Sequence, residues 1–568
     1  MRFDWNFNLL NLDEKQLEIV KQKNLEFVTK WEKRTDYLED PQILLEALIE
    51  FDQLQKNFGT TGDLGYYYGL RHSQDQSNSE VNAKLNQIDE FGTKLYNQIQ
   101  FFLLRLAKIS RENQKKFTEN KELKPFKHFL EQLFAQGKYL LSEPEEKIIN
   151  LKQAASHGNW IKMTSTFLGK EKLEELMAGL LSADVKVREQ SGQEINKIME
   201  KYVEVAENEL NSILYNKKIE DELRGIARPD LPRHLADDIG SEIVDAMVEA
   251  VSTKFSLAHQ FYELKAKKLG INKLKYWDRN APIGNFEKKY NFENSVKLVS
   301  QVFADLDLEF KKILEGYVEN GQIDVLPKKG KRGGAFCAID RSTQPTYILL
   351  NHTETLRDVL TLAHETGHGI NNELMKTQKY ALNFGQPLSV AEVASTFMED
   401  FVLQKLVQTA GPEEKSSLIM KKLDDDIGTI FRQVACYKFE KELHSEFRQK
   451  NFLSKEEIGK LFQKHMHAYM GDYVEQSEGS QNWWVYWSHI RSFFYVYSYA
   501  SGLLISKALQ NKVKKDPKFI EKVKWLLAQG SSDSPKNLFS KLGINITNKD
   551  FWNSGLDEVE LLLKEVKS

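Results

Sequence analysis

Two histidines and a glutamate near the middle of the chain have the types and spacing of a catalytic metal site. They lie in the sequence His364-Glu365-Thr366-Gly367-His368. On a helix, His364 and His368 are one turn apart and project to the same side. Two neutral imidazoles at this spacing can hold zinc at about 2.0–2.1 Å each, and Glu365 is close enough to act on an activated water. The alternative is a chance pair of core or surface histidines with an incidental glutamate.

A third protein ligand is expected for such a site, together with one open position for water. Glu392 follows the breaker Gly385-Gln386-Pro387 and lies one helix-turn-helix length after His368. An antiparallel helical hairpin would bring its carboxylate to the metal. Because Ser389 precedes it by three residues, Glu392 also fits a capping box, and the spacing alone leaves both interpretations open.

The element that must position the two histidines is a helix. Its lead-in has apolar residues three and four positions apart, from Leu356 to Ala363. Thr355 and Asp358 have the spacing of a capping box, which predicts the start of the helix.

Two short apolar runs before this helix predict strands. They are residues 335–339 and Tyr347–Leu350, each close to glycine or proline, and we expect a small sheet beside the metal-binding helix. Gly333 and Gly334 would let an extended peptide approach the edge of this sheet. A simple turn before a strand explains the two glycines equally well.

The rest of the chain is mainly helical. We expect a helical N-terminal region over residues 1–216 and a catalytic domain with the H-E-x-x-H helix over residues 217–568. Prolines are frequent between Arg224 and Pro412, which favours shorter elements and loops there. Aromatic residues gather between Gly479 and Gly502, where packing is the expected role of most.

Charge and composition exclude several classes of protein. The net charge is −3, from 79 Lys+Arg against 82 Asp+Glu, which does not suggest a nucleic-acid or membrane partner. Two cysteines cannot form a disulfide framework or a cysteine-only zinc site. The N-terminal residues lack the apolar core of a secretory signal, and no stretch has the length of a membrane span. We therefore expect a cytoplasmic protein.

The motifs together resemble a known family. The H-E-x-x-H sequence, followed by residues 391–397, is similar to the oligoendopeptidase F group of the thimet-oligopeptidase-like zinc metallopeptidases, peptidase family M3. Residues 333–337, the run Leu360–Ala363, and His489 followed by residues 494–502 agree with this resemblance. The blocks match in order and separation over roughly the C-terminal two-thirds of the chain. The resemblance implies a zincin-like helical fold with a deep central cleft, of which residues 1–216 would form one wall.

The resemblance also implies roles for individual residues. One zinc ion would be held by His364, His368 and Glu392, with Glu365 as general base and acid. The family pattern places a histidine and a tyrosine at the oxyanion, and His489 matches the histidine. If the segment after His489 is helical, Tyr497 shares its face better than Tyr495 does, so Tyr497 is preferred over Tyr495 and Tyr499.

Two further assignments concern the surroundings of the metal. Glu399 lies seven residues after Glu392 on the same helix face, where it would orient a ligand histidine or be an ordinary surface glutamate. Substrate binding is assigned to the segment Gly333, Gly334, Ala335 and Phe336, and to Tyr495.

The sequence thus predicts a zinc-dependent endopeptidase that hydrolyses short unstructured oligopeptides. One alternative is a dipeptidyl-carboxypeptidase or carboxypeptidase on a related scaffold, with Arg491 as a group that captures the substrate C-terminus. Another is a peptide-binding protein without catalysis. The natural peptide, the oligomeric state and closure of the cleft do not follow from the sequence.

Overall fold

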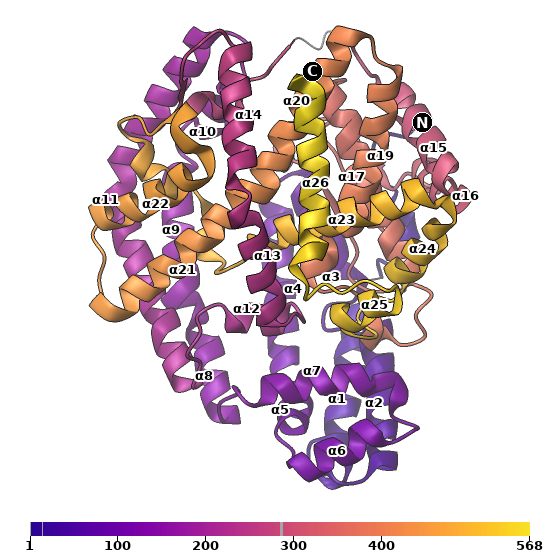
Figure 1. Ribbon diagram of the computed structural model, residues 1–568. Coiled ribbons are helices and arrows are strands. Elements are labelled where there is room, and N and C mark those ends of the chain that lie inside the picture. Colours follow the sequence, from indigo (N-terminus) through magenta and orange to yellow (C-terminus); the bar gives the residue numbers. More distant parts are fainter. Residues whose placement is uncertain (1, 14, 285–287, 568) are drawn as a thin grey trace. The chain divides into compact units, whose positions relative to one another are not determined.

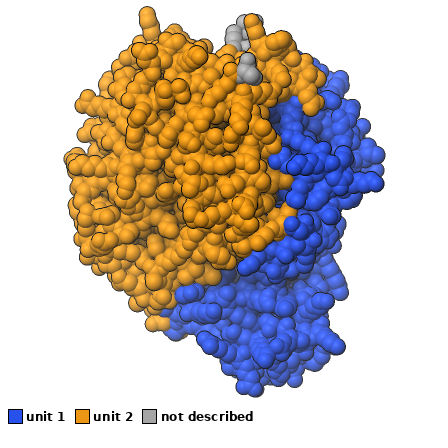
Figure 2. Space-filling view, in the orientation of Figure 1, with its two compact units in different colours: residues 1–143, 288–405, 509–543 blue, residues 144–287, 406–508, 544–568 orange. Residues whose placement is uncertain are grey.

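The computed structural model describes residues 2–13, 15–284 and 288–567, and most of them are in α-helices (Figure 1). The mainly α-helical fold predicted from the sequence is confirmed, including a small sheet. The chain forms two compact units, each assembled from three segments (Figure 2). Unit 1 contains residues 1–143, 288–405 and 509–543, and unit 2 contains residues 144–287, 406–508 and 544–568. The domain boundary expected at residue 216 falls inside one long helix, Val185–Leu223.

Unit 1 begins with a bundle of amphipathic helices. Asp40 caps the second of them, accepting hydrogen bonds from the N–H groups of Gln42 and Ile43, with Pro41 at the first helical position. Phe27, Phe51 and Phe102 pack together in its core. The helices are α1 (Gln16–Trp31), α2 (Pro41–Asn57), α3 (Gly62–Gln74), α4 (Ser79–Ile99), α5 (Phe101–Ala107), α6 (Arg111–Glu119) and α7 (Lys127–Gly137).

The second and third segments of unit 1 carry the H-E-x-x-H sequence. Their helices are α15 (Phe292–Leu306), α16 (Leu308–Glu319), α17 (Leu356–Met375), α18 (Leu388–Ala391), α19 (Val393–Thr409), α24 (Ile520–Ala528) and α25 (Pro535–Lys541). Three short strands lie between α16 and α17: β2 (Ile323–Asp324), β3 (Phe336–Ala338) and β4 (Tyr347–Leu349). They form a sheet in the order β2-β4-β3, with β4 parallel to β2 and antiparallel to β3. Both predicted strands are present, and the sheet contacts α17.

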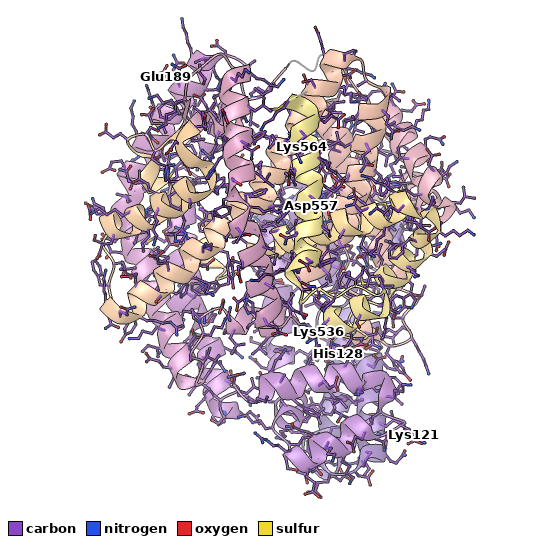
Figure 3. All side chains as sticks on the ribbon, in the orientation of Figure 1. Lys121, His128, Glu189, Lys536, Asp557 and Lys564 are labelled. Carbon is purple, nitrogen blue, oxygen red and sulfur yellow. The ribbon has the colours of Figure 1, made fainter. Side chains whose placement is uncertain are left out.

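Unit 2 is also helical, with one additional pair of parallel strands, β1 (Leu274–Lys275) and β5 (Val474–Glu475). Its last helix, α26 (Lys549–Lys567), buries Trp552 and Leu556 while Asp557 and Lys564 project to the outside (Figure 3). The other helices are α8 (Glu143–Gln153), α9 (Asn159–Leu168), α10 (Leu173–Gly179), α11 (Val185–Leu223), α12 (Leu231–Ala236), α13 (Ser241–Thr253), α14 (Phe255–Lys268), α20 (Pro412–Asp426), α21 (Gln433–Lys450), α22 (Lys455–Met470) and α23 (Tyr497–Lys515). Among the described residues, no helix combines the length and apolar character needed to cross a bilayer.

Candidate metal centre

Helix α17 begins at the capping box predicted from the sequence. The Thr355 hydroxyl accepts a hydrogen bond from the N–H of Asp358, and the Asp358 carboxylate accepts one from the N–H of Thr355. One face of the helix is buried, including Val359, Leu362 and Ile370. Capping and burial together fix the direction in which His364 and His368 project.

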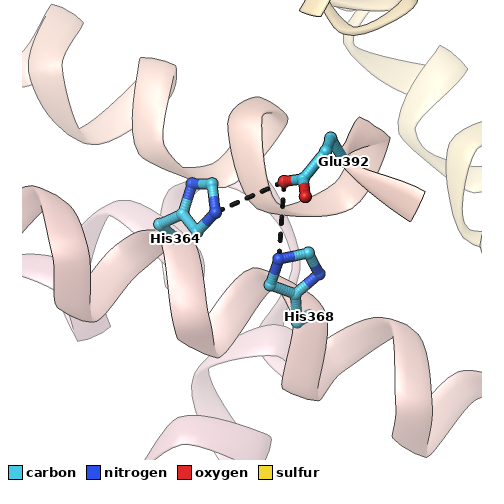
Figure 4. Close-up of side chains that lie close together, drawn as sticks. All are labelled: His364, His368 and Glu392. Carbon is cyan, nitrogen blue, oxygen red and sulfur yellow. Dashed lines mark ion pairs between the residues drawn. The ribbon is translucent and has the colours of Figure 1, made fainter. Parts of the chain in front are cut away.

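The two histidines and Glu392 converge on one point in unit 1 (Figure 4). His364 Nε2 lies 3.4 Å from Glu392 Oε2, and His368 Nε2 lies 3.5 Å from the same oxygen. The two imidazole rings are nearly perpendicular, with an interplanar angle of 80° and centroids 5.1 Å apart. All three side chains are half-buried, so the site remains accessible.

These separations fit a zinc ion. Ligand atoms at about 2.0–2.1 Å from a tetrahedral metal are roughly 3.3–3.4 Å from one another. A good hydrogen bond between a ring nitrogen and a carboxylate would be shorter, at about 2.7–3.2 Å. Burial alone would raise the pKa of Glu392, but the two imidazoles hold it well below its ordinary range, so the carboxyl group is anionic, as a metal ligand must be. The residues present are therefore suited to a two-histidine, one-carboxylate zinc site.

Glu392 reaches the histidines because α17 and α19 approach each other very closely. At Gly367 in α17, a Cβ atom would lie 2.7 Å from Ser395 Cα and 2.8 Å from the Ala394 carbonyl oxygen. Only glycine allows this approach. The capping box considered for Ser389 and Glu392 is absent, since Pro387 precedes α18 as its N-cap and Glu392 lies at the junction of α18 and α19.

Three further side chains surround the ligands. Glu399 Oε2 lies 2.9 Å from His364 Nδ1, the ring nitrogen that faces away from Glu392. The Ser395 hydroxyl donates a hydrogen bond of 3.0 Å to Glu392 Oε2, a contact that the sequence analysis did not anticipate. Glu365 is only 7% exposed, and burial raises the pKa of its carboxyl above the ordinary value. A raised pKa brings the carboxyl closer to the range in which it can accept a proton and return it.

The segment assigned to substrate binding lies beside α17. The side-chain amide of Asn372 in α17 is 3.5 Å from Cys337 Sγ in β3. Gly333 and Gly334 are exposed, and Gly334 has a φ of +75°, which favours glycine. Ala335 and Phe336 are half-buried. Among the described residues, β3 pairs only with β4, so its other edge is open.

His489 and the three candidate tyrosines belong to unit 2. His489 lies in a short 3₁₀ helix, Ser488–Arg491, and α23 begins only at Tyr497, so the continuous helix on which the preference for Tyr497 depended is absent. Tyr497 is fully buried and donates a 2.7 Å hydrogen bond to Asp237. Tyr499 has its hydroxyl 3.1 Å from His489 Nε2, and the ring of Tyr495 lies 5.6 Å from that of His489.

The loop between His489 and α23 has an unusual backbone. Phe493 and Phe494 have φ values of +45° and +57°. This conformation costs roughly 1–2 kcal/mol for each side chain larger than glycine. The fully buried Glu440 accepts a 2.6 Å hydrogen bond from the N–H of Phe494. Glu440 is a residue that the sequence analysis missed, because its distance of 54 residues from Phe494 gives no local signal.

Arg491 does not suit the carboxypeptidase alternative. Its guanidinium is 4% exposed and donates to both carboxylate oxygens of Glu209, at 2.7 and 2.8 Å. It also donates to the carbonyl oxygens of Trp487 and Val485. A guanidinium occupied in this way cannot capture the C-terminus of a substrate.

Family models and known relatives match most of the chain. The family model for peptidase family M3 matches residues 181–558, and the model named oligopeptidase F matches residues 105–178. An oligoendopeptidase F homolog of Lactococcus lactis subsp. lactis is 26% identical, over 93% of this chain and 91% of its own length. Oligopeptidase PepF of Bacillus subtilis is 25% identical, over 92% of this chain and 82% of its own length.

Solved structures share the fold. Oligoendopeptidase F from Enterococcus faecium superposes with a TM-score of 0.71 at 18% identity, covering 98% of both chains. PZ peptidase A, in a structure with an inhibitor, gives a TM-score of 0.80 at 17% identity and covers 99% of both chains. With the family model spanning residues 181–558, the chain belongs to peptidase family M3 and is a metalloendopeptidase of the oligoendopeptidase F type.

Proposed function

We propose that this protein is a zinc-dependent endopeptidase that hydrolyses internal bonds of short, unstructured oligopeptides. The observation that carries the proposal is the convergence of His364, His368 and Glu392 at separations of 3.4 and 3.5 Å. The three residues would hold one zinc ion. When bound, zinc supplies a Lewis acid that polarises the scissile carbonyl and lowers the pKa of water towards about 7.

Glu365 performs the proton transfers. Its carboxylate takes a proton from the attacking water and returns it to the leaving amine, so that one residue acts first as base and then as acid. Glu399 keeps its contact with His364 Nδ1, which fixes the orientation of the ring and leaves Nε2 for the metal.

Stabilisation of the oxyanion is assigned to hydrogen-bond donors from the segment that contains His489. We propose His489 together with a tyrosine, as the family resemblance implies. Helical spacing favoured Tyr497, which donates its hydroxyl to Asp237, whereas the contact with His489 favours Tyr499. Donors that are already oriented stabilise the developing charge without a cost of reorganisation at the moment of reaction.

Peptide binding is assigned to residues 333–336 and Tyr495. The open edge of β3 offers backbone hydrogen bonds to an extended peptide regardless of its sequence, which favours broad specificity. Most backbone N–H and C=O groups of a folded protein are already paired, so short unstructured peptides are the expected substrates.

The test replaces Glu365 with glutamine. Because Glu365 is not a ligand, Glu365→Gln should keep its zinc while kcat falls by about 10²- to 10⁴-fold. Zinc content would be measured by elemental analysis, and hydrolysis with an internally quenched peptide and mass spectrometry of a peptide pool. The exposed Glu319→Gln on α16 is the matched control. Unchanged turnover in Glu365→Gln, or wild-type turnover that survives a chelator, would refute the proposal.

A further inference from the structure

A cavity of about 480 Å³ lies in unit 1 on one face of β3. Its lining includes Phe336 and Ala338, which alternate along β3 and therefore share a face, and Asp340 just beyond the strand. Helix α3 contributes Gly65, Gly69 and Leu70 to the lining. The volume is in the range of cavities that hold small organic groups.

The backbone of β3 shows which residue can pair with an added strand. The N–H of Ile348 in β4 donates to the Gln322 carbonyl, so it points away from β3. Ile348 lies opposite Cys337, and this pair is therefore the non-hydrogen-bonded type. The N–H and C=O of Cys337 consequently face the open edge of β3, where an extended peptide would bind.

The side chains of such a peptide would alternate between the two faces of the sheet. The residue opposite Cys337 would point to the face of Cys337, where Asn372 of α17 lies 3.5 Å from its sulfur. The residues on either side of it would point to the face of Phe336 and Ala338. That face is the wall of the cavity.

We propose that this cavity is a specificity pocket that receives a bulky apolar side chain, preferably aromatic, from a substrate residue next to the one paired with Cys337. The inference rests on the proposed function, because it takes the peptide on β3 to be the substrate.

The chemistry of the lining supports an apolar occupant. Tyr66, Leu70 and Phe336 supply apolar surface, and the Tyr66 hydroxyl is engaged with the carbonyl oxygens of Ala338 and Pro345. Arg332 lies over the Phe336 ring, 5.2 Å from its centroid, while Asp89 contributes a carboxylate to the rim. The exposed charged residues of the lining, Arg332, Asp89 and Asp340, have both signs and therefore do not select a side chain of one charge.

Gly69 offers a way to fill the cavity without disturbing the fold. It lies in α3 with an ordinary helical backbone, and a Cβ added there meets no atom within 4 Å. Gly69→Leu would extend an apolar side chain into the cavity. Gly316→Leu in α16 is the matched control, since a Cβ at Gly316 also meets no atom within 4 Å and this residue is not part of the lining.

The experiment uses quenched peptides with one phenylalanine moved along an alanine background. The wild type should prefer phenylalanine at a defined position relative to the cut. In Gly69→Leu, kcat/KM for that peptide should fall about 10- to 100-fold, the loss expected when an aromatic side chain is no longer buried. The kcat/KM of Gly69→Leu for the all-alanine peptide should differ from that of the wild type by less than about twofold. Gly316→Leu should have the wild-type kcat/KM for both peptides.

A second measurement separates this inference from the proposed function. Binding of the labelled phenylalanine peptide to Glu365→Gln, with and without Gly69→Leu, is followed by fluorescence anisotropy and needs no turnover. Weaker binding caused by Gly69→Leu supports the pocket even if hydrolysis is absent. If Gly69→Leu, shown to be folded by its circular dichroism and melting temperature, has the wild-type preference and affinity, the pocket is refuted while the endopeptidase assignment remains.

Discussion

Three carboxylates surround one pair of imidazoles, and each has a different environment. Glu392 Oε2 is within 3.5 Å of both Nε2 atoms, Glu399 contacts the Nδ1 atom of His364, and Glu365 is the most buried of the three. The same residue type can therefore serve as ligand, orienting group and proton carrier. The different roles proposed for the three glutamates follow from their positions relative to the two histidines.

At this scale we predict that Glu399→Ala weakens zinc binding by about 10- to 100-fold. Loss of the Glu399 carboxylate frees the His364 ring to rotate. It also removes the hydrogen-bond acceptor at Nδ1 that makes the imidazole a more basic ligand. A competition titration with a chromophoric chelator measures the dissociation constant. Glu399→Gln keeps an acceptor oxygen and should lose less affinity than Glu399→Ala. Wild-type zinc affinity in Glu399→Ala would contradict the orienting role.

At the scale of elements, the geometry of the candidate metal centre depends on the close packing of α17 and α19. The helices meet where Gly367 faces the backbone of Ala394 and Ser395. The atoms that a Cβ would meet are backbone atoms, which cannot rotate away. Any side chain at Gly367 must therefore move one helix and carry Glu392 away from the histidines.

Gly367→Ala should lower zinc affinity and turnover together, each by tenfold or more, and destabilise the fold by about 1–3 kcal/mol through overpacking. Elemental analysis, peptide hydrolysis and thermal unfolding measure the three effects. The control is Gly316→Ala in α16, where a Cβ has open space and the helix gains propensity. If Gly367→Ala retained full zinc affinity, the close approach would not be what positions Glu392.

At the scale of the whole molecule, buried carboxyl groups link stability to pH. Burial raises the pKa of Glu440 well above its ordinary value of 4.5, although the N–H of Phe494 partly opposes the shift. The folded protein therefore keeps a proton on Glu440 that the unfolded chain releases. The contribution of Glu440 to stability is complete below pH 4.5 and decreases as the pH rises towards its pKa in the folded protein.

Glu440→Gln mimics the protonated carboxyl and removes this pH dependence. The melting temperature of the variant relative to the wild type should therefore increase as the pH is raised from 4.5 towards the pKa of Glu440 in the folded protein. Thermal unfolding at several pH values measures the difference. Burial lowers the pKa of the neighbouring His444, but His444 titrates in both proteins and its effect cancels. A constant difference in melting temperature across this range would contradict the prediction.

Several features of the site could be predicted because the signals are local. The spacing of His364 and His368, the capping box at Thr355 and the apolar runs of β3 and β4 each occupy fewer than about ten residues. Such patterns depend on backbone geometry, which is the same in every protein. The mainly helical fold also followed from periodicity and from the family resemblance, and it is confirmed.

Other features depend on residues that are distant in the sequence. The hydrogen bond from Phe494 to Glu440 spans 54 residues, and the pairing of Arg491 with Glu209 spans 282. The left-handed backbone of Phe493 and Phe494 interrupts the helix expected from His489 to Tyr497. Bulky residues otherwise avoid this conformation, and the hydrogen bond to the buried Glu440 helps to compensate for its cost.

The sequence by itself determined the chemistry available to this protein: two imidazoles one turn apart, a glutamate between them, and further carboxylates on the next helix. Only the tertiary structure decided that Glu392 is at the junction of α18 and α19 within reach of both rings, and that the edge of β3 is open beside a cavity. The physical reason is that side-chain types and helical spacing are encoded locally, whereas the approach of two helices and the pairing of strand edges depend on packing between distant segments.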